Sequence, residues 1–149
     1  MLIQVFNKLK DEGLDYILLI IGEGFEKEPE LKNLANEMIH FLGVKSNVMD
    51  YLYSSDAFCL TSFYEGMPIS LIEALATGCI PVCTPVGGIV NTIQHGITGY
   101  LSKGVSETDY IYAIREFIKG KDQINRNRLV EIFKDNFSIG HCSKSYMAL

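Results

Sequence analysis

The sequence predicts an α/β fold of the doubly wound, Rossmann-like class, in which a parallel sheet lies between two layers of helices. Short apolar runs alternate with longer amphipathic segments, and this alternation is typical of a parallel sheet covered by helices. The runs are apolar on both faces, which suits a fully covered sheet better than a half-exposed antiparallel one. A length of 149 residues fits one domain.

The expected strands are short apolar runs, and the expected helices are the amphipathic segments between them. Strands are predicted over residues 16–21, 39–42, 57–61, 80–84 and 99–102. Helices are predicted over residues 1–10, 28–37, 47–54, 69–77, 88–94, 107–119 and 122–135. The first helix places Leu2, Val5, Phe6 and Leu9 on one side. Because a doubly wound domain ordinarily opens with a strand, we expect a first strand and its loop to lie outside residues 1–149.

Composition and charge narrow the class of partner. The chain carries a net charge of −5 and has no cluster of Lys and Arg, which argues against nucleic acid or an anionic membrane as the main partner. The longest apolar run, residues 16–21, is far too short to span a bilayer, and no signal peptide is expected. The four cysteines (Cys59, Cys79, Cys83 and Cys142) lack zinc or redox spacing. We therefore expect reduced, structural cysteines and a cytoplasmic protein.

The segment from Ser62 to Gly78 carries the strongest signal for a ligand site. It follows a predicted strand and runs into a predicted helix, and ligands of open parallel sheets bind at the carboxyl ends of strands. Gly66 lets a ligand approach the backbone closely, and Pro68 suits the first turn of a helix. Free amides at this helix start, together with the positive end of the helix dipole, would face an anion such as a diphosphate.

Two carboxylates flank this helix start. Glu65 lies in the loop, and Glu73 lies about one turn into a helix that is apolar nearly all round, so we expect Glu73 to be buried. A buried, unpaired carboxylate costs several kcal/mol, so Glu73 needs donors such as the two hydroxyls of a vicinal diol. The structural alternative is that residues 70–73 form a capping box, in which Glu73 only binds a backbone amide. That alternative starts the helix at Leu71 and leaves Glu65 unexplained.

Six ordered motifs resemble the retaining glycosyltransferases of group one, which have the two-domain GT-B fold. The central match is Glu65 and Glu73, with seven residues between them, followed by residues 74–82. The other matches are residues 19–24, 40–43, 55–62, 84–88 and 95–99. The resemblance covers nearly the whole chain. It implies that residues 1–149 form the C-terminal, donor-binding domain, without its first strand and without the N-terminal acceptor domain.

The resemblance also implies roles for individual residues. Glu65, the residue with the catalytic role, would hold hydroxyls of the donor sugar, and Glu73 would hold the ribose hydroxyls. The backbone of Gly66, Met67, Pro68 and Ile69 would cradle the sugar and the distal phosphate. Gly22 would border the donor, and the backbone of His40 would contact the nucleobase. The family retains anomeric configuration and needs no metal or cofactor beyond the nucleotide-diphosphate sugar.

The resemblance leaves gaps and alternatives. The Arg and Lys that neutralise the diphosphate in the family lie upstream of the sequence matched here, so the fragment alone is expected to be inactive. The acceptor is expected to be a glycan or a lipid-linked sugar, which the absent domain would bind at the inner face of the membrane.

The main alternative is a non-catalytic nucleotide-sugar-binding or protein-interaction module on the same fold. A flavodoxin-like receiver would need an acidic cluster at strand ends, where only Asp56 is found.

Overall fold

Parallel strands alternate with helices along the chain. The computed structural model describes residues 1–141 and 143, apart from the side chain of Glu26. Strands are β1 (Leu18–Ile21), β2 (Ile39–Gly43), β3 (Ala57–Leu60), β4 (Ile80–Cys83) and β5 (Tyr100–Leu101). Helices are α1 (Leu2–Asp11), α2 (Pro29–Leu34), α3 (Val48–Ser54), α4 (Ile69–Thr77), α5 (Ile89–Thr92), α6 (Glu107–Gly120) and α7 (Arg126–Asn136). Short 3-10 turns lie at Phe25–Lys27 and Lys121–Gln123.

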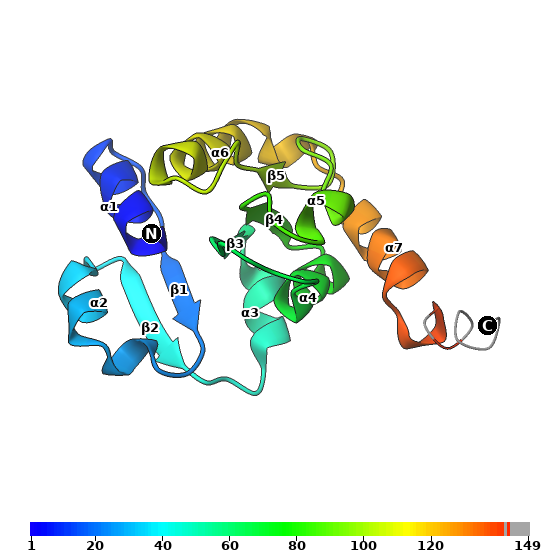
Figure 1. Ribbon diagram of the computed structural model, residues 1–149, viewed down its shortest axis with the longest axis horizontal. Helices are drawn as coiled ribbons and strands as arrows, with labels where there is room; N and C mark the ends of the chain where they lie inside the picture. Colours follow the sequence, from blue (N-terminus) through cyan, green and yellow to red (C-terminus); the bar gives the residue numbers. More distant parts are fainter. Residues whose placement is uncertain (142, 144–149) are drawn as a thin grey trace.

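The strands form two parallel sheets. β1 pairs with β2, with Leu18 opposite Ile39, and β4 pairs with β3 on one side and β5 on the other. Figure 1 shows the two groups of strands side by side, with β1 and β2 apart from β3, β4 and β5. The predicted fold class is confirmed, because the strands are parallel and flanked by helices. The expected single sheet, however, is divided between β1 and β3 among the described residues.

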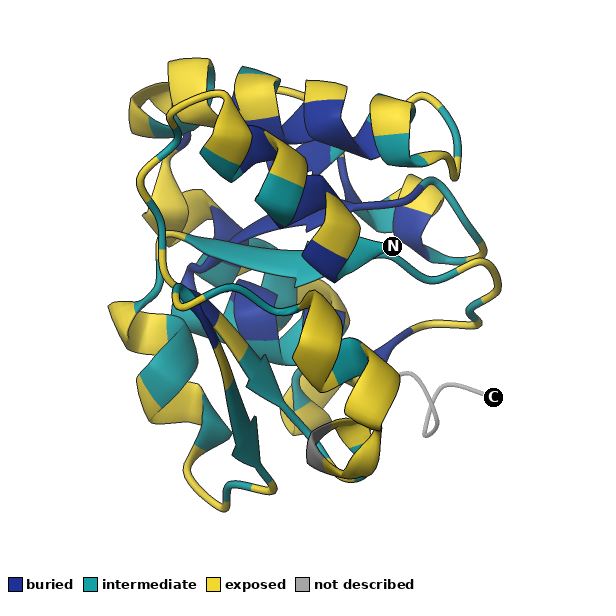
Figure 2. Ribbon diagram, turned by 90° about the vertical axis from the view of Figure 1, so that its left-hand side faces the viewer, coloured by how far each residue is buried: buried dark blue, intermediate teal, exposed yellow. Residues whose placement is uncertain are grey.

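Helices cover the strands from both sides. α1 and α6 lie together along one side (Figure 1), joined by ion pairs from Lys8 to Glu107 at 2.6 Å and from Arg115 to Glu12 at 2.5 Å. α4 packs between α3 and α7 on the other side. Figure 2 shows that the helices turn buried residues inward and exposed residues outward. None of the helices in the described part of the chain is long and apolar enough to cross a membrane.

The core is centred on β4. All four of its residues are fully buried, and the Tyr110 hydroxyl of α6 donates a hydrogen bond to the Val82 carbonyl at 2.6 Å. α4 contributes Leu71, Ala74 and Leu75 to the same core. These contacts fix α4 against β4, and they position the loop that leads into α4.

Two observed helices are shorter than predicted at one end, and in both a polar side chain binds the backbone near that end. The helix predicted over residues 28–37 ends at Leu34, because the Asn36 side chain accepts from the Met38 amide at 2.8 Å and donates to Tyr16 at 2.8 Å. The helix predicted over residues 122–135 begins instead at Arg126, where the Asn125 side chain caps it by accepting from the Asn127 amide.

Candidate functional site

The candidate site begins where the loop after β3 enters α4. The helix begins at Ile69, directly after Pro68, and no side chain caps its first turn. The capping-box alternative required a start at Leu71 with a side-chain cap, so it does not describe this helix. Glu73 lies in the second turn of α4, and Glu65 lies in the loop before it, as the sequence predicted.

The start of α4 presents unused backbone donors. Among the described residues, nothing accepts a hydrogen bond from the amides of Gly66, Met67, Ile69 or Ser70. Gly66 is exposed, and a Cβ added there would meet no atom within 4 Å. These amides, together with the positive end of the helix dipole, form an arrangement that favours an anion.

The loop after β4 holds the loop before α4 in place. The hydroxyl of Thr84, which is fully buried, donates to the Ser62 carbonyl at 2.6 Å. The Gly88 amide donates to the Gly66 carbonyl at 2.7 Å, and a Cβ on Gly87 would overlap the Glu65 carbonyl oxygen. The two loops therefore touch through their backbones, and only glycine fits at the point of contact.

Glu65 has one fixed carboxylate oxygen and one free one. The Ser62 hydroxyl donates to Oε1 of Glu65 at 2.6 Å, while Oε2 has no partner in the described part of the chain. The Glu65 side chain is half-buried, and its neighbour Tyr64 is 93% exposed. The free oxygen can accept a hydrogen bond from a ligand hydroxyl, and Ser62 limits the rotation of the carboxylate.

Glu73 is half-buried, whereas the apolar composition of its helix predicted full burial. The core-facing side of α4 consists of Leu71, Ala74 and Leu75, and the helical period places Glu73 on the other side. Its carboxylate makes no hydrogen bond or ion pair with the described residues. Both oxygens are therefore available to a ligand, at a smaller cost in desolvation than full burial imposes.

Gly22 and His40 lie in the other sheet. Gly22 follows β1 with φ +147°, and its amide donates to the Gly43 carbonyl at 3.0 Å, so the ends of β1 and β2 are joined. His40 lies inside β2, opposite Leu19, with an exposed side chain. The roles that the family resemblance implies for these two residues stay predictions.

Three positioning residues have no counterpart among the predicted site residues. Thr84 and Gly87 act on the loop before α4 from the loop after β4, whereas Ser62 acts from within the loop before α4. The Gly87-Gly88 pair after a strand is a sequence signal for a close backbone approach, although it does not identify what is approached.

Two ion-paired cations and one surface depression are formed by residues outside the loop before α4. Lys121 and Arg126 pair with Asp56 at 3.1 and 3.8 Å, at the amino end of β3 and thus at the opposite end of that strand. A depression of about 360 Å³ lies between α1 and α6, lined in part by Lys8 and Arg115. In the described part of the chain, no three acidic, histidine or cysteine side chains converge as metal ligands would.

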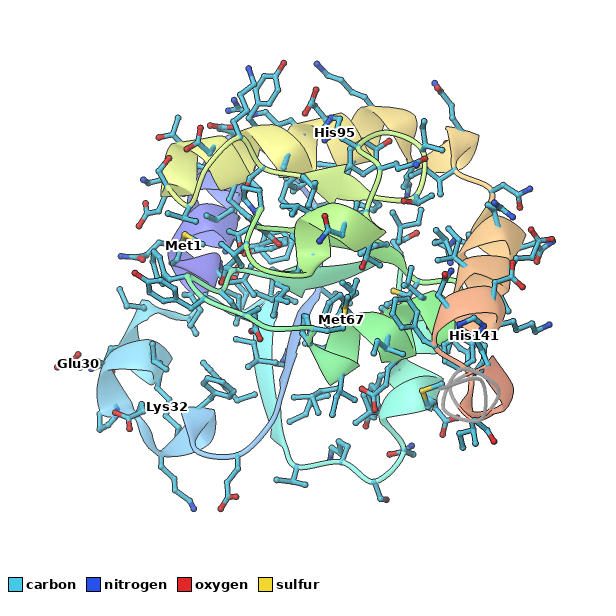
Figure 3. The ribbon with its side chains drawn as sticks, turned by 45° about the vertical axis from the view of Figure 1, so that its right-hand side comes forward. Met1, Glu30, Lys32, Met67, His95 and His141 are labelled. Carbon is cyan, nitrogen blue, oxygen red and sulfur yellow. The ribbon has the colours of Figure 1, made fainter. Side chains whose placement is uncertain are left out.

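His95 has a structural position. Its Nδ1 accepts from the Leu101 amide at 3.1 Å, and its Nε2 lies 3.3 Å from Glu116. Figure 3 shows His95 beside α6, apart from Met67 in the loop before α4. His95 therefore joins its own loop to α6.

Comparison with known proteins identifies the same family. The model of the glycosyl transferases group 1 family matches residues 1–135. N-acetyl-alpha-D-glucosaminyl L-malate synthase of Bacillus anthracis is 35% identical over 129 residues, which are 84% of this chain and 33% of that protein. The chain thus spans about a third of the length of this curated relative.

Solved glycosyltransferases share the fold. A glycosyltransferase from Rickettsia africae has a TM-score of 0.81 at 20% identity, over 98% of this chain and 41% of that one. Anabaena HepE, solved with UDP and glucose, has a TM-score of 0.77 at 17% identity, over 97% of this chain and 44% of that one. These similarities identify the Rossmann-like architecture as that of GT-B glycosyltransferase domains. Together with the family model, they show that this chain belongs to the group 1 glycosyltransferases.

Proposed function

We propose that residues 1–149 form the C-terminal, nucleotide-sugar-binding domain of a retaining, metal-independent hexosyltransferase. The reaction would move a sugar from a nucleotide diphosphate to a glycan or a lipid-linked acceptor. The C1–O bond to the diphosphate would break and leave its electron pair on the diphosphate. An acceptor hydroxyl would give its proton to the departing diphosphate and form a new C1–O bond on the same face. The domain would work at the cytoplasmic side of a membrane.

The residues before and within α4 would each bind a different part of the donor. Amides of Gly66, Met67 and Ile69 would donate to the diphosphate and stabilise the charge that develops on it as it leaves. Pro68 would shape this cradle without a donor of its own. The free oxygen of Glu65 would accept from sugar hydroxyls, which orients C1 towards the acceptor.

The other contacts would hold the nucleoside. Glu73 would accept from both ribose hydroxyls, since both of its oxygens lack a partner among the described residues. Gly22 would border the donor, and the backbone of His40 would contact the nucleobase. The observation that carries the proposal is the set of unused amides at the start of α4 between two carboxylates that still have free oxygens. HepE, with the same fold, binds UDP and glucose, which supports a nucleotide-sugar donor.

Binding and turnover are separate expectations for this chain. The family's diphosphate-neutralising Arg and Lys and its acceptor-binding domain would have to come from outside residues 1–149. We therefore expect the chain alone to bind a donor without transferring its sugar.

Calorimetric titration of Glu73→Gln with UDP-glucose, and with the GDP and ADP sugars, tests the assignment of the donor site. The substitution keeps the volume and removes the charge, so binding should weaken by about ten- to a hundred-fold, which corresponds to about 1.5–3 kcal/mol. Glu131→Gln is the matched control, because Glu131 is an exposed glutamate on α7 that pairs with Arg128 at 3.0 Å. Equal weakening in both variants, or none in Glu73→Gln, would contradict the donor site.

A further inference from the structure

Phe25 exposes an aromatic ring beside the carboxyl end of β1. It is the first residue of the 3-10 turn Phe25–Lys27, close behind the strand, and it is 44% exposed. A Cβ added to Gly22, the residue directly after β1, would lie 3.0 Å from Cε2 and 3.5 Å from Cδ2 of the Phe25 ring. One edge of the ring therefore rests on the backbone of Gly22, while much of the residue stays open to solvent.

Backbone contacts fix the ring in this position. Gly22 has φ +147°, a conformation that favours glycine, and its amide donates to the Gly43 carbonyl at the end of β2 at 3.0 Å. The turn that carries the ring is closed by the Lys27 amide, which donates to the Gly24 carbonyl at 2.9 Å, and the turn packs against β2. Val44, the residue after β2, is 70% exposed. The carboxyl ends of both strands therefore carry exposed apolar groups.

The charge around the ring is negative. Glu23, Glu28 and Glu30 are exposed on the segment that carries Phe25. Lys27, on the same segment, lies 4.0 Å from Glu23 as its ion-pair partner. This segment disfavours an anion, whereas the free amides and the helix dipole at the start of α4 favour one. An uncharged part of an extended ligand therefore suits the ends of β1 and β2, and its anionic part suits α4.

We propose that Phe25 stacks on the nucleobase of the donor and determines how strongly the nucleotide is bound. The inference rests on the proposed function, in which Gly22 borders the donor and the backbone of His40 contacts the base. Aromatic side chains bind nucleobases through their π faces, and this interaction tolerates every base. A flat, uncharged base suits an exposed ring in acidic surroundings. Phe25 thus contributes affinity for the nucleoside, while the amides at α4 bind the diphosphate.

Substitutions at position 25 separate stacking from the structural contact with Gly22. Phe25→Leu keeps an apolar group against Gly22 and removes the π face. It should keep most of the free energy of unfolding in urea, yet in calorimetric titration it should bind UDP, ADP and GDP about five- to a hundredfold more weakly, the range of base–aromatic stacking. Phe25→Tyr keeps the π face and should retain most of the affinity.

A tryptophan at this position can report on the contact directly, because the chain contains no tryptophan. Phe25→Trp introduces a single indole in place of the exposed ring. The matched control is Tyr53→Trp, since Tyr53 is 63% exposed on α3, a helix that contributes nothing to the proposed donor site. A base that stacks on an indole quenches its fluorescence. UDP, ADP and GDP should therefore quench Phe25→Trp to saturation and leave Tyr53→Trp unchanged.

Pyrophosphate distinguishes stacking from a change in the shape of the loop. It carries two phosphates and no base, so it should leave the fluorescence of Phe25→Trp unchanged. Quenching by pyrophosphate as strong as that by the nucleotides would overturn the stacking. An equal loss of nucleotide affinity in Phe25→Leu and Phe25→Tyr would overturn it as well, because only one of these variants lacks the π face.

Failure of the stacking and failure of the donor site give different results. If the unsubstituted chain binds the nucleotides and Phe25→Leu binds them equally well, the stacking is wrong and the donor site stands. The same conclusion follows if the nucleotides bind to Phe25→Trp in calorimetry without quenching its indole. If the unsubstituted chain binds none of UDP, ADP and GDP, the donor site and the stacking are both wrong.

Discussion

Gly87 is the residue whose substitution should most directly disturb the loop before α4. Its φ is +53°, and a Cβ would overlap the Glu65 carbonyl, so Gly87→Ala should both strain the backbone and push the loop away. Gly96→Ala is the matched control, since Gly96 has φ +75° and open space around a Cβ. We expect Gly96→Ala to cost about 1 kcal/mol in the free energy of unfolding, and Gly87→Ala about 1–3 kcal/mol more.

Urea unfolding measures both variants, and donor titration adds a second readout. Donor binding should weaken in Gly87→Ala and stay unchanged in Gly96→Ala. Similar losses in stability and binding for the two variants would show that the close approach to Glu65 has no consequence.

Residues that act through local sequence could be predicted, and those that act across strands could not. Gly66, Pro68, Glu65 and Glu73 lie within one strand-to-helix turn, where spacing alone predicts their grouping. The contact between Thr84 and Ser62 joins residues 22 positions apart, and it depends on the pairing of β3 with β4. The pattern of residues along the sequence does not show which strands pair with each other. The half-burial of Glu73 was missed for a related reason, because small apolar neighbours such as Ala76 do not show which side of the helix faces the core.

At the scale of elements, α6 is held to β4 by a buried hydroxyl. The Tyr110 hydroxyl donates to the Val82 carbonyl, and burial raises the pKa of Tyr110 well above 10.0, so the donor stays protonated. Tyr110→Phe should lower the free energy of unfolding by about 1 kcal/mol. Tyr112→Phe, on the exposed side of the same helix, removes a hydroxyl outside the core and should change it little. Chemical denaturation measures the free energy of unfolding of both variants. Equal losses in the two variants would show that the buried hydrogen bond of Tyr110 does not stabilise the fold.

The order and type of the elements followed from the sequence because hydrophobic period is a local property. Each predicted strand overlaps an observed one, and each predicted helix overlaps an observed helix. The ends were harder to predict. The apolar pattern places Tyr16 and Ile17 in the first strand, yet Ile17 is 67% exposed and the strand starts at Leu18. Partners of a strand determine where it begins, and sequence pattern does not identify those partners.

At the scale of the whole molecule, the sequence predicted the class of the fold and not the continuity of its sheet. Apolar runs at β1 and β3 resemble those of covered strands whether or not a neighbour is present. The division of the sheet is therefore visible only in the pairing, where β1 and β3 each have a single partner among the described residues. Both runs have the composition of interior strands, yet β1 and β3 each have one edge without a partner among the described residues.

The buried thiols make the stability of the whole molecule depend on alkaline pH. Burial raises the pKa of Cys79 from 9.0 to about 12, and that of Cys83 well above 9.0. Between about pH 9 and pH 12 the unfolded chain has lost the Cys79 proton and the folded chain retains it. The unfolded state then binds fewer protons, so stability falls as pH rises, by about 1.4 kcal/mol per pH unit for each such thiol.

Thermal unfolding from pH 7 to pH 11 tests this in a Cys142→Ala background, because Cys142 lies outside the described residues. The unfolding temperature of the background protein should stay constant up to about pH 8.5 and fall progressively at higher pH. Its thiols should resist a disulfide reagent until the protein unfolds. Alkaline solution also weakens ion pairs at the surface, which is a second cause of lost stability. Cys79→Ala separates the two causes. It should be less stable at pH 7, since it leaves a small cavity, but its decline above pH 9 should be shallower. Parallel curves with and without Cys79 would show that the Cys79 thiol does not cause the alkaline loss.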